Sequence, residues 1–383
     1  PYSLSVKGER GPEQTIPDVL VGEVWLCAGQ SNMVLQLHRA LNARQELEDA
    51  NNDSIRMLTI PLGGNATPQD TLPGPVAWHK TEPALARDFS ATCFYFAREL
   101  QRTVNVPMGL IVAAWGGSRV QAWTSAAAVP PQPEEPPRPS YAPPDAPGAI
   151  RNAMIAPLDN LSVRAILWYQ GEANTGPTQA SRYQDLLRRF MADWREQFGA
   201  HVPFLIVQLA NYGPQPTAPV ESGWAQVREA QRLAVKQDAN AGLAISIDIG
   251  DAYDLHPSNK QEVGRRLARA ARRVIYGEAI PPSGPVVQSA RKQGDRVIVT
   301  FAVVTGQLIT YSSTHPIGFE LCAAEPGSCR YVEATIDQNR VALDADDVAA
   351  ATRVRYCWAD SPVCTLFDEA RLPAGPFQIQ VQQ

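Results

Sequence analysis

Residues 20–280 alternate between short apolar runs and longer stretches with a helical period, and this alternation constrains the fold more than any other feature. The short runs are rich in β-branched residues, which is typical of buried strands. We expect strands at Val19–Ala28, Met108–Ala114, Val163–Tyr169, Val202–Ala210 and Gly242–Ile249. We expect helices at Asn32–Leu41, Ala91–Arg102, Gln179–Phe198, Trp224–Gln237 and Asn259–Tyr276. Five strands that alternate with helices predict a parallel sheet covered on both faces, a three-layer α/β/α sandwich.

Two segments interrupt this alternation. Residues 129–148 are dense in proline, which excludes a regular helix or a central strand. This segment is either a solvated surface loop or a loop that shapes the substrate cleft. Residues 50–90 are expected to be irregular and are a second candidate border of the cleft.

The sequence pattern changes after about Pro285, where short apolar runs lie between expected turns. Strands are expected at Arg296–Val303, Gln307–Tyr311, Thr335–Ile336, Arg340–Leu343 and Thr352–Trp358. We therefore predict an α/β domain at residues 19–283 and a β-rich domain at residues 284–383. Residues 1–18 begin as a strand without a preceding turn, so we expect them to be a leader strand or the end of an upstream β-domain.

Composition and charge exclude several classes of protein. Apolar residues make up 44% of the chain, which is enough for a substantial core. The net charge is −5 with acidic and basic residues intermixed, so no basic stripe indicates nucleic-acid binding. The sequence has no apolar stretch of about 18 residues, and we expect no membrane association. The first residues do not resemble a signal peptide, which by itself does not assign a compartment.

The six cysteines fall into two groups. Cys27 and Cys93 lie in apolar patterns and are expected to be buried thiols. The other four form two pairs, each seven residues apart, which we expect to be disulfides: Cys322–Cys329 and Cys357–Cys364. Such disulfides would indicate an oxidising compartment, whereas the alternative is four unpaired cysteines. The His and Cys spacings do not match a metal site, so we expect no metal.

The first expected core strand leads directly into Gly29-Gln30-Ser31-Asn32-Met33. A serine between a strand and a helix can act as a nucleophile, because the start of the helix offers backbone N–H groups to an oxyanion. The alternative is that Ser31 only caps the helix. The motif differs from the Gly-x-Ser-x-Gly elbow, because Met33 occupies the second glycine position.

Two further motifs follow the second and third strands. Trp115-Gly116-Gly117-Ser118 contains paired glycines, whose backbone can approach a ligand closely or form a tight turn. The third strand leads into a polar turn that contains Gln170, Glu172 and Asn174. Gln170 offers an amide donor for an oxyanion, and Glu172 offers a carboxylate that can orient the loops. The aromatic residues near these motifs are candidates either for sugar stacking or for the core: Trp115, Trp123, Trp168 and Tyr169.

The fourth motif follows the fifth strand and contains a histidine with several acidic neighbours. Asp254 lies two residues before His256, so both side chains can lie on the same side of an extended segment. An imidazole base requires such an acceptor to fix its tautomer. Of the five histidines, only His256 is expected at the carboxyl end of a strand beside acids. Because ligands of open α/β sheets bind beyond the carboxyl ends of the strands, we expect the four motifs to meet there.

These motifs resemble those of the sialate O-acetylesterase family within the SGNH hydrolases. The resemblance covers nearly the whole chain and includes VGEVWLCAGQSNM, AAWGGSRVQAWTS, NAMIAPL, ILWYQGEANT, DLHPSNKQEVGRRLA and YCWADSPVCTLFDEARLPAGPF. It implies a flavodoxin-like SGNH hydrolase fold with Ser31 as the nucleophile and His256 as the base. It also implies an oxyanion hole formed by the backbone N–H of Ser31, a backbone N–H of Gly116 or Gly117, and the side chain of Gln170.

The acid of the triad is open. Many SGNH enzymes have an aspartate three residues before the histidine, where this sequence has Tyr253. We favour Asp254, with Asp251 or Asp248 as alternatives if the loop folds back. Residues expected to bind substrate or support the site are Gln30, Asn32, Trp115, Glu172, Asn174 and Asp251.

The expected activity is hydrolysis of O-acetyl groups on carbohydrate through an acetyl-enzyme, without a cofactor, in the periplasm or outside the cell. The substrate is either an O-acetylated sialic acid or an acetylated plant polysaccharide such as xylan or xyloglucan. A carbohydrate-binding protein that lost catalysis would lack a member of the triad, and the sequence lacks none. A lipase or peptidase is a weaker alternative, because no lid-like amphipathic helix is present. The sequence does not predict the oligomeric state.

Overall fold

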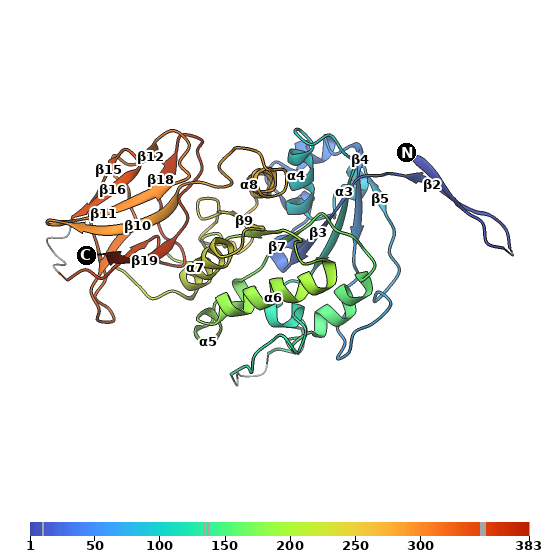
Figure 1. Ribbon diagram of the computed structural model, residues 1–383, viewed down its shortest axis with the longest axis horizontal. Coiled ribbons are helices and arrows are strands. Elements are labelled where there is room, and N and C mark those ends of the chain that lie inside the picture. The colour runs from blue at the N-terminus through green and yellow to red at the C-terminus, as the bar shows by residue number, and fades with distance from the viewer. Residues whose placement is uncertain (10, 134, 136–137, 345–349, 383) are drawn as a thin grey trace.

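The computed structural model describes residues 1–9, 11–133, 135, 138–344 and 350–382. Figure 1 shows an α/β domain beside a β-rich C-terminal domain, with an N-terminal hairpin that projects away from both. The hairpin consists of β1 (Tyr2–Val6) and β2 (Gln14–Val19), which pair antiparallel with each other. Nearly all of its residues are exposed, so the hairpin buries almost no surface within the described chain.

The α/β domain is built on a seven-stranded sheet with the order β5-β4-β6-β3-β7-β8-β9. Its strands are β3 (Glu23–Gly29), β4 (Asn52–Thr59), β5 (His79–Thr81), β6 (Met108–Ala114), β7 (Ala165–Tyr169), β8 (Phe204–Val207) and β9 (Ala241–Ala244). All neighbouring strands are parallel except the β4–β5 pair. Each of the five predicted strands is present, and most are shorter than predicted.

The prediction that residues 50–90 are irregular was wrong for two strands. β4 and β5 both lie in that segment and extend the sheet beyond β6. The first half of β4 reads Asn-Asp-Ser, and its side chains there are largely exposed. A strand that starts with polar residues lacks the continuous apolar pattern typical of a buried parallel strand, so the periodicity did not reveal it.

Helices cover both faces of the sheet and confirm the three-layer arrangement (Figure 1). α4 (Ala91–Leu100) packs with α8 (Lys260–Val274) on one face, and α6 (Tyr183–Phe198) packs with α7 (Gly223–Lys236) on the other. The shorter helices are α1 (Ser31–Val34), α2 (Ala43–Glu48), α3 (Pro83–Ala86) and α5 (Pro177–Ala180). Single turns of 3₁₀ or π helix lie at Leu37–Arg39, Val120–Trp123, Arg151–Ile155, Ala156–Leu158 and Glu172–Asn174. Among the described residues, no helix is both long and apolar enough to cross a bilayer.

The first predicted helix, at Asn32–Leu41, is much shorter in the structure. α1 ends at Val34, and the chain then becomes extended before a single 3₁₀ turn. Ala91 donates its backbone N–H to the carbonyl of Leu35 at 2.8 Å, so the chain after α1 is bound to the start of α4 instead of continuing as a helix. Tertiary contacts therefore overrode the local helical pattern here.

Aromatic side chains fill the core between the sheet and α6. Trp168 on β7 stacks on Phe190 with ring centroids 4.1 Å apart, and the indole N–H of Trp194 donates to the carbonyl of Trp123 at 2.7 Å. Trp123, Trp168 and Tyr169 are completely buried, so they belong to the core and are not available to stack on a sugar. Trp115 is partly buried at the edge of this core.

The structure contains three disulfides, one more than predicted. Cys322–Cys329 and Cys357–Cys364 are bonded as expected. The prediction of free thiols at Cys27 and Cys93 was wrong, because these residues form a disulfide between β3 and α4. They are 66 residues apart in sequence, so only the packing of α4 against the sheet brings them together.

The C-terminal domain contains an eight-stranded sheet and a separate two-stranded sheet. The large sheet has the order β14-β13-β17-β19-β10-β11-β16-β15, and β12 pairs with β18. Its strands are β10 (Val286–Gln293), β11 (Arg296–Ala302), β12 (Leu308–Thr310), β13 (Phe319–Cys322), β14 (Arg330–Tyr331), β15 (Ala334–Asp337), β16 (Arg340–Asp344), β17 (Arg353–Tyr356), β18 (Leu366–Asp368) and β19 (Phe377–Gln382). Alternate residues of β11 point into an apolar core that is separate from that of the α/β domain.

Candidate active site

Three of the four predicted motifs begin at the same level of the sheet. In the register of the central strands, Gly29 at the end of β3 pairs with Ala114 of β6 and with Tyr169 of β7. Gly29 has a φ of 140°, and a Cβ at this position would lie 2.1 Å from the carbonyl oxygen of Tyr169. Only glycine therefore allows the strands to approach so closely before the chain turns toward Ser31.

Ser31 is the first residue of α1 and lies directly beside the glycine motif. The residue that precedes the helix is Gln30, and no side chain caps the helix start. Ser31 is therefore not the helix cap that the sequence left open as an alternative. A Cβ on Gly116 would lie 3.4 Å from the Cβ of Ser31, so the backbone of Gly116 borders the proposed nucleophile.

Buried amide side chains tie the three loops together behind Ser31. The Oε1 atom of Gln30 accepts hydrogen bonds from Gln170 Nε2 at 3.2 Å and from the backbone N–H of Ala173 at 3.2 Å. Gln170 Nε2 also donates to the carbonyl of Ser118 at 3.1 Å and to Asn174 Oδ1 at 2.8 Å. The amide of Gln170 is therefore already committed to acceptors within the protein. It acts as a brace between the loops and has no free proton for an oxyanion.

A second buried network connects the candidate nucleophile with the loop that carries His256. This loop, residues 245–259 between β9 and α8, is called the histidine loop below. Asn32 Nδ2 donates to Glu172 Oε1 at 2.6 Å and to the carbonyl of Leu255 at 3.1 Å. Asn32 Oδ1 accepts a hydrogen bond from Lys260 Nζ at 2.5 Å. Asn32 follows Ser31 and Leu255 precedes His256, so this network holds the two candidate catalytic residues on adjacent segments.

Burial governs the charges in this network. Burial raises the pKa of the Glu172 carboxyl, although Asn32 and the cation of Lys260 oppose the rise. Burial also lowers the pKa of Lys260 to about 7, opposed by Glu172 and Asp254. Lys260 was not predicted from the sequence, where its only signal is its place at the start of the helix that follows His256.

His256 lies in a loop that folds back on itself through short-range hydrogen bonds. Asp251 Oδ1 accepts the backbone N–H groups of Tyr253 at 2.7 Å and Asp254 at 3.2 Å. Asp254 Oδ1 accepts the backbone N–H of His256 at 2.7 Å and lies 3.6 Å from its Nδ1. The Nε2 atom of His256 is buried, and no residue described by the structure bonds to it. This nitrogen is therefore available to take a proton.

The pKa of His256 lies below its ordinary value. Burial is the main cause, and the positive charges of Lys260 and Arg39 act in the same direction. The carboxylate of Asp254 opposes them and raises the pKa. The imidazole is therefore neutral near pH 7, as a general base requires.

The three candidate acids occupy different environments. Asp248 forms a two-pronged ion pair with Arg266, at 2.6 and 2.7 Å, and is thereby committed to α8. Asp251 is committed to the backbone of the loop. Asp254 is the one of the three whose carboxylate lies beside the imidazole, and its side chain is 61% exposed.

The proline-rich segment lies against the glycine motif. Arg138 Nη2 donates to the carbonyl of Gly117 at 2.7 Å, and Pro143 lies 3.8 Å from where a Cβ on Gly117 would be. Arg119, two residues after Gly117, forms ion pairs with Glu135 at 2.6 Å and Asp145 at 3.0 Å. The described part of residues 129–148 therefore lies beside the candidate site, as its interpretation as a cleft-shaping loop requires. Residues 134, 136 and 137 lie outside the described residues.

Comparison with known proteins defines the class to which this fold and site belong. The family model for carbohydrate esterases described as sialic acid-specific acetylesterases matches residues 21–273. The chain therefore belongs to this family, and its predicted enzyme class, a carboxylic ester hydrolase, is confirmed.

Particular relatives agree with this assignment. Human sialate O-acetylesterase is 29% identical over 401 residues, which cover 94% of this chain and 76% of the human protein. Sialate O-acetylesterase from Mus musculus is 28% identical over 428 residues, which cover 96% of this chain and 79% of the mouse protein. The crystal structure of XAC1771, a carbohydrate acetylesterase from Xanthomonas citri, has a TM-score of 0.91 at 35% identity, covering 99% of this chain and 85% of that one.

Proposed function

We propose that this carbohydrate esterase removes O-acetyl groups by a Ser31–His256–Asp254 mechanism at the carboxyl edge of its parallel sheet. The observation that carries the proposal is the hydrogen bond from Asn32 to the carbonyl of Leu255, at 3.1 Å. This bond holds the serine turn against the histidine loop, beside the backbone of Gly116. This arrangement supports a serine esterase site at this edge of the sheet.

The chemistry proceeds in two halves. His256 Nε2 takes the proton of Ser31, whose oxygen attacks the acetyl carbonyl. The backbone N–H groups of Ser31 and of Gly116 or Gly117 stabilise the negative charge on the carbonyl oxygen. His256 then returns the proton to the departing sugar oxygen, and water hydrolyses the acetyl-enzyme by the same route. Asp254 orients the imidazole and stabilises its charged form.

An O-acetylated sialic acid is the first substrate we propose, because the family model and the curated relatives carry that name. A second candidate is a neutral acetylated polysaccharide such as xylan or xyloglucan. Arg119 and Arg138, which lie beside the glycine motif, are both paired with acids of the proline-rich segment. These arginines are therefore less available to bind the carboxylate of a sialic acid. Release of acetate from acetylated sialic acid, xylan and xyloglucan, compared side by side, decides between the two.

We further propose that the protein works in an oxidising compartment, either the periplasm or the extracellular space. Its support is that all six cysteines are paired in three disulfides. Such disulfides persist in oxidising compartments and are rare in the cytosol.

Two substitutions test the catalytic assignment. Ser31→Ala and His256→Ala should each lower turnover of p-nitrophenyl acetate by at least about 10⁴-fold, because removal of one member of a triad disables the whole unit. Circular dichroism should show an unchanged fold. Ser181→Ala and His201→Ala replace exposed residues of the same types and should leave turnover unchanged. Full activity in Ser31→Ala would refute the assignment.

A further inference from the structure

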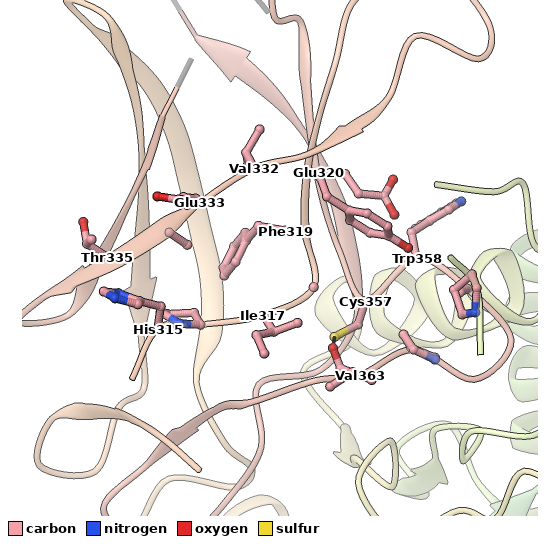
Figure 2. Close-up of a pocket in the computed structure, with 17 residues that line it drawn as sticks. His315, Ile317, Phe319, Glu320, Val332, Glu333, Thr335, Cys357, Trp358 and Val363 are labelled. Atoms are coloured by element: carbon pink, nitrogen blue, oxygen red, sulfur yellow. Dashed lines mark hydrogen bonds between the residues drawn. The ribbon is translucent and has the colours of Figure 1, made fainter. Parts of the chain in front are cut away.

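The disulfide-closed loop of the C-terminal domain contacts the α/β domain on the side of the histidine loop. This loop, residues 357–364, is closed by the Cys357–Cys364 disulfide. Figure 2 shows Cys357, Trp358 and Val363 between the strands of the C-terminal domain and the helices of the α/β domain. On the side of the C-terminal domain, the loop lines a pocket of about 370 Å³. Its other side is bound by polar contacts to the α/β domain.

Arg228 on α7 is the anchor of this contact. Its side chain is completely buried, and its guanidinium donates to four backbone carbonyls. Two of them, Leu209 at 2.9 Å and Ala210 at 2.7 Å, belong to the segment after β8. The other two, Ala359 at 2.6 Å and Asp360 at 2.8 Å, belong to the disulfide loop. Arg228 therefore fixes the disulfide loop against the carboxyl end of β8.

Asn211 connects the disulfide loop with the histidine loop through its side-chain amide. Its Nδ2 donates to Ser361 Oγ of the disulfide loop at 3.4 Å, and its Oδ1 accepts the backbone N–H of Gly250 at 2.9 Å. A Cβ on Gly250 would lie 2.1 Å from the carbonyl oxygen of Asn211, so the two backbones are in direct contact. Two residues further on, Gly213 donates its N–H to the carbonyl of Ala252 at 3.1 Å.

We propose that Asn211 is a positioning residue, through which the disulfide loop of the C-terminal domain sets the place of the loop that carries His256. The proposal rests on the proposed function of His256. Its basis is the uninterrupted path of contacts from Ser361 through Asn211 to Gly250, four residues before Asp254. The path matters because the middle of the histidine loop is exposed, and the bond from Asn32 to Leu255 holds the loop only on the side of the nucleophile. A C-terminal domain remote in sequence thereby becomes part of the catalytic arrangement.

The test compares variants of the full chain that break the path at different points. Asn211→Ala removes both contacts and should lower kcat on p-nitrophenyl acetate by roughly tenfold with little change in KM, since a small displacement of a catalytic group is costly. Ser361→Ala loses the contact to the disulfide loop and keeps the acceptor for Gly250, so it should lower kcat by roughly threefold. Asn211→Asp keeps the acceptor for Gly250 and offers a carboxylate to which the Ser361 hydroxyl can donate, so it should retain most of the kcat.

Glu221→Ala is the matched control, because Glu221 pairs with Arg355 across the same pair of domains at 2.9 Å without contacting the histidine loop. Its kcat should remain unchanged. The acid limb of the pH profile and the rate of Ser31 labelling by a fluorophosphonate should change in Asn211→Ala and not in Glu221→Ala. The groups that set the charge of His256 in this readout are Asp254, Lys260 and Arg39.

Each outcome bears on the proposal. A wild-type kcat and pH midpoint in Asn211→Ala would overturn it, and so would an equal loss in Glu221→Ala, which would indicate general loosening of the domains. If Asn211→Ala does not fold, Ser361→Ala decides in the same way. If His256→Ala is inactive while Asn211→Ala is unaffected, the positioning role alone is wrong. If His256→Ala remains active, the proposed function is wrong and the positioning role is wrong with it.

Discussion

The two halves of the proposed active site are held in place in different ways. On the nucleophile side, Gln30, Gln170 and Asn174 are at most 2% exposed and bond to one another beneath Ser31. On the base side, Tyr253 is 97% exposed and the side chain of Asp254 is 61% exposed. The first half is part of the packed end of the sheet, whereas the second is a surface loop.

Because of this difference, substitutions in the two halves should affect stability and activity differently. Buried polar groups that lose a partner destabilise the fold, so substitutions on the nucleophile side should reduce stability and activity together. The histidine loop buries little of its own, so substitutions there should affect activity and its pH dependence while the fold persists. Asn32 and Asn211 are the points at which the rigid part supports the exposed part.

The substitution Gln30→Ala tests this comparison on the nucleophile side, where it should reduce both stability and activity. It leaves the partly buried backbone N–H of Ala173 without its acceptor, and it removes one of the three acceptors of the Gln170 amide. Each buried donor left unpaired costs about 1–3 kcal/mol of stability. The displaced turn should also lower kcat/KM by roughly 100-fold, because Ser31 follows directly. Thermal unfolding and p-nitrophenyl acetate turnover measure the two effects.

Gln30→Glu is the matched control, because it retains an oxygen acceptor of the same length. It should recover part of the stability that the alanine variant loses. If Gln30→Ala lowers activity with no loss of stability, the nucleophile side is not held by this network and the comparison fails.

A smaller effect is expected from Asp254→Asn on the exposed side. The carboxylate raises the pKa of His256 and stabilises its charged form, so its loss should lower the activity plateau by roughly tenfold. A triad acid that is buried costs about 10⁴-fold when replaced, and the exposure of Asp254 reduces that figure. The melting temperature should remain close to that of the wild type.

The pH profile of kcat/KM should shift in a defined direction when Asp254 is replaced. The base acts in its neutral form, and burial holds the pKa of His256 below 6.5, so the acid limb of kcat/KM should have its midpoint below 6.5. Without the opposing carboxylate the pKa falls further, so the midpoint should move to lower pH in Asp254→Asn. Asp185→Asn, on the exposed side of α6, should leave it in place. A shift to higher pH would contradict the assignment of Asp254.

The same division explains what the sequence could predict. The nucleophile side follows from apolar strands that end in polar or glycine-rich motifs, and these strands were all located. β4 was missed because its first half is polar, and the Cys27–Cys93 disulfide was missed because only the packing of α4 on the sheet brings its cysteines together.

The supports of the histidine loop could not be predicted for a related reason. Asn211 lies in a loop without a pattern, and its partners Gly250 and Ser361 are distant along the chain. Gln170 was predicted to be an oxyanion donor because its residue type and position allow that role. Whether its protons are free depends on neighbours from three loops, which no local pattern encodes.

The last effect concerns the pH dependence of stability alone and arises at Lys260, which supports both halves through Asn32. Burial lowers its pKa to about 7 from 10.5, so between these values the unfolded chain holds a proton that the folded protein has released. This group therefore makes the free energy of unfolding rise with pH in that range, by at most about 1.4 kcal/mol per pH unit. Lys260→Met should flatten that rise in urea unfolding measured from pH 7 to 10, whereas Lys236→Met, at an exposed position on α7, should not. An equal slope in the wild type and in Lys260→Met would show that Lys260 stays charged, and that the network joining the two halves is an ionic one.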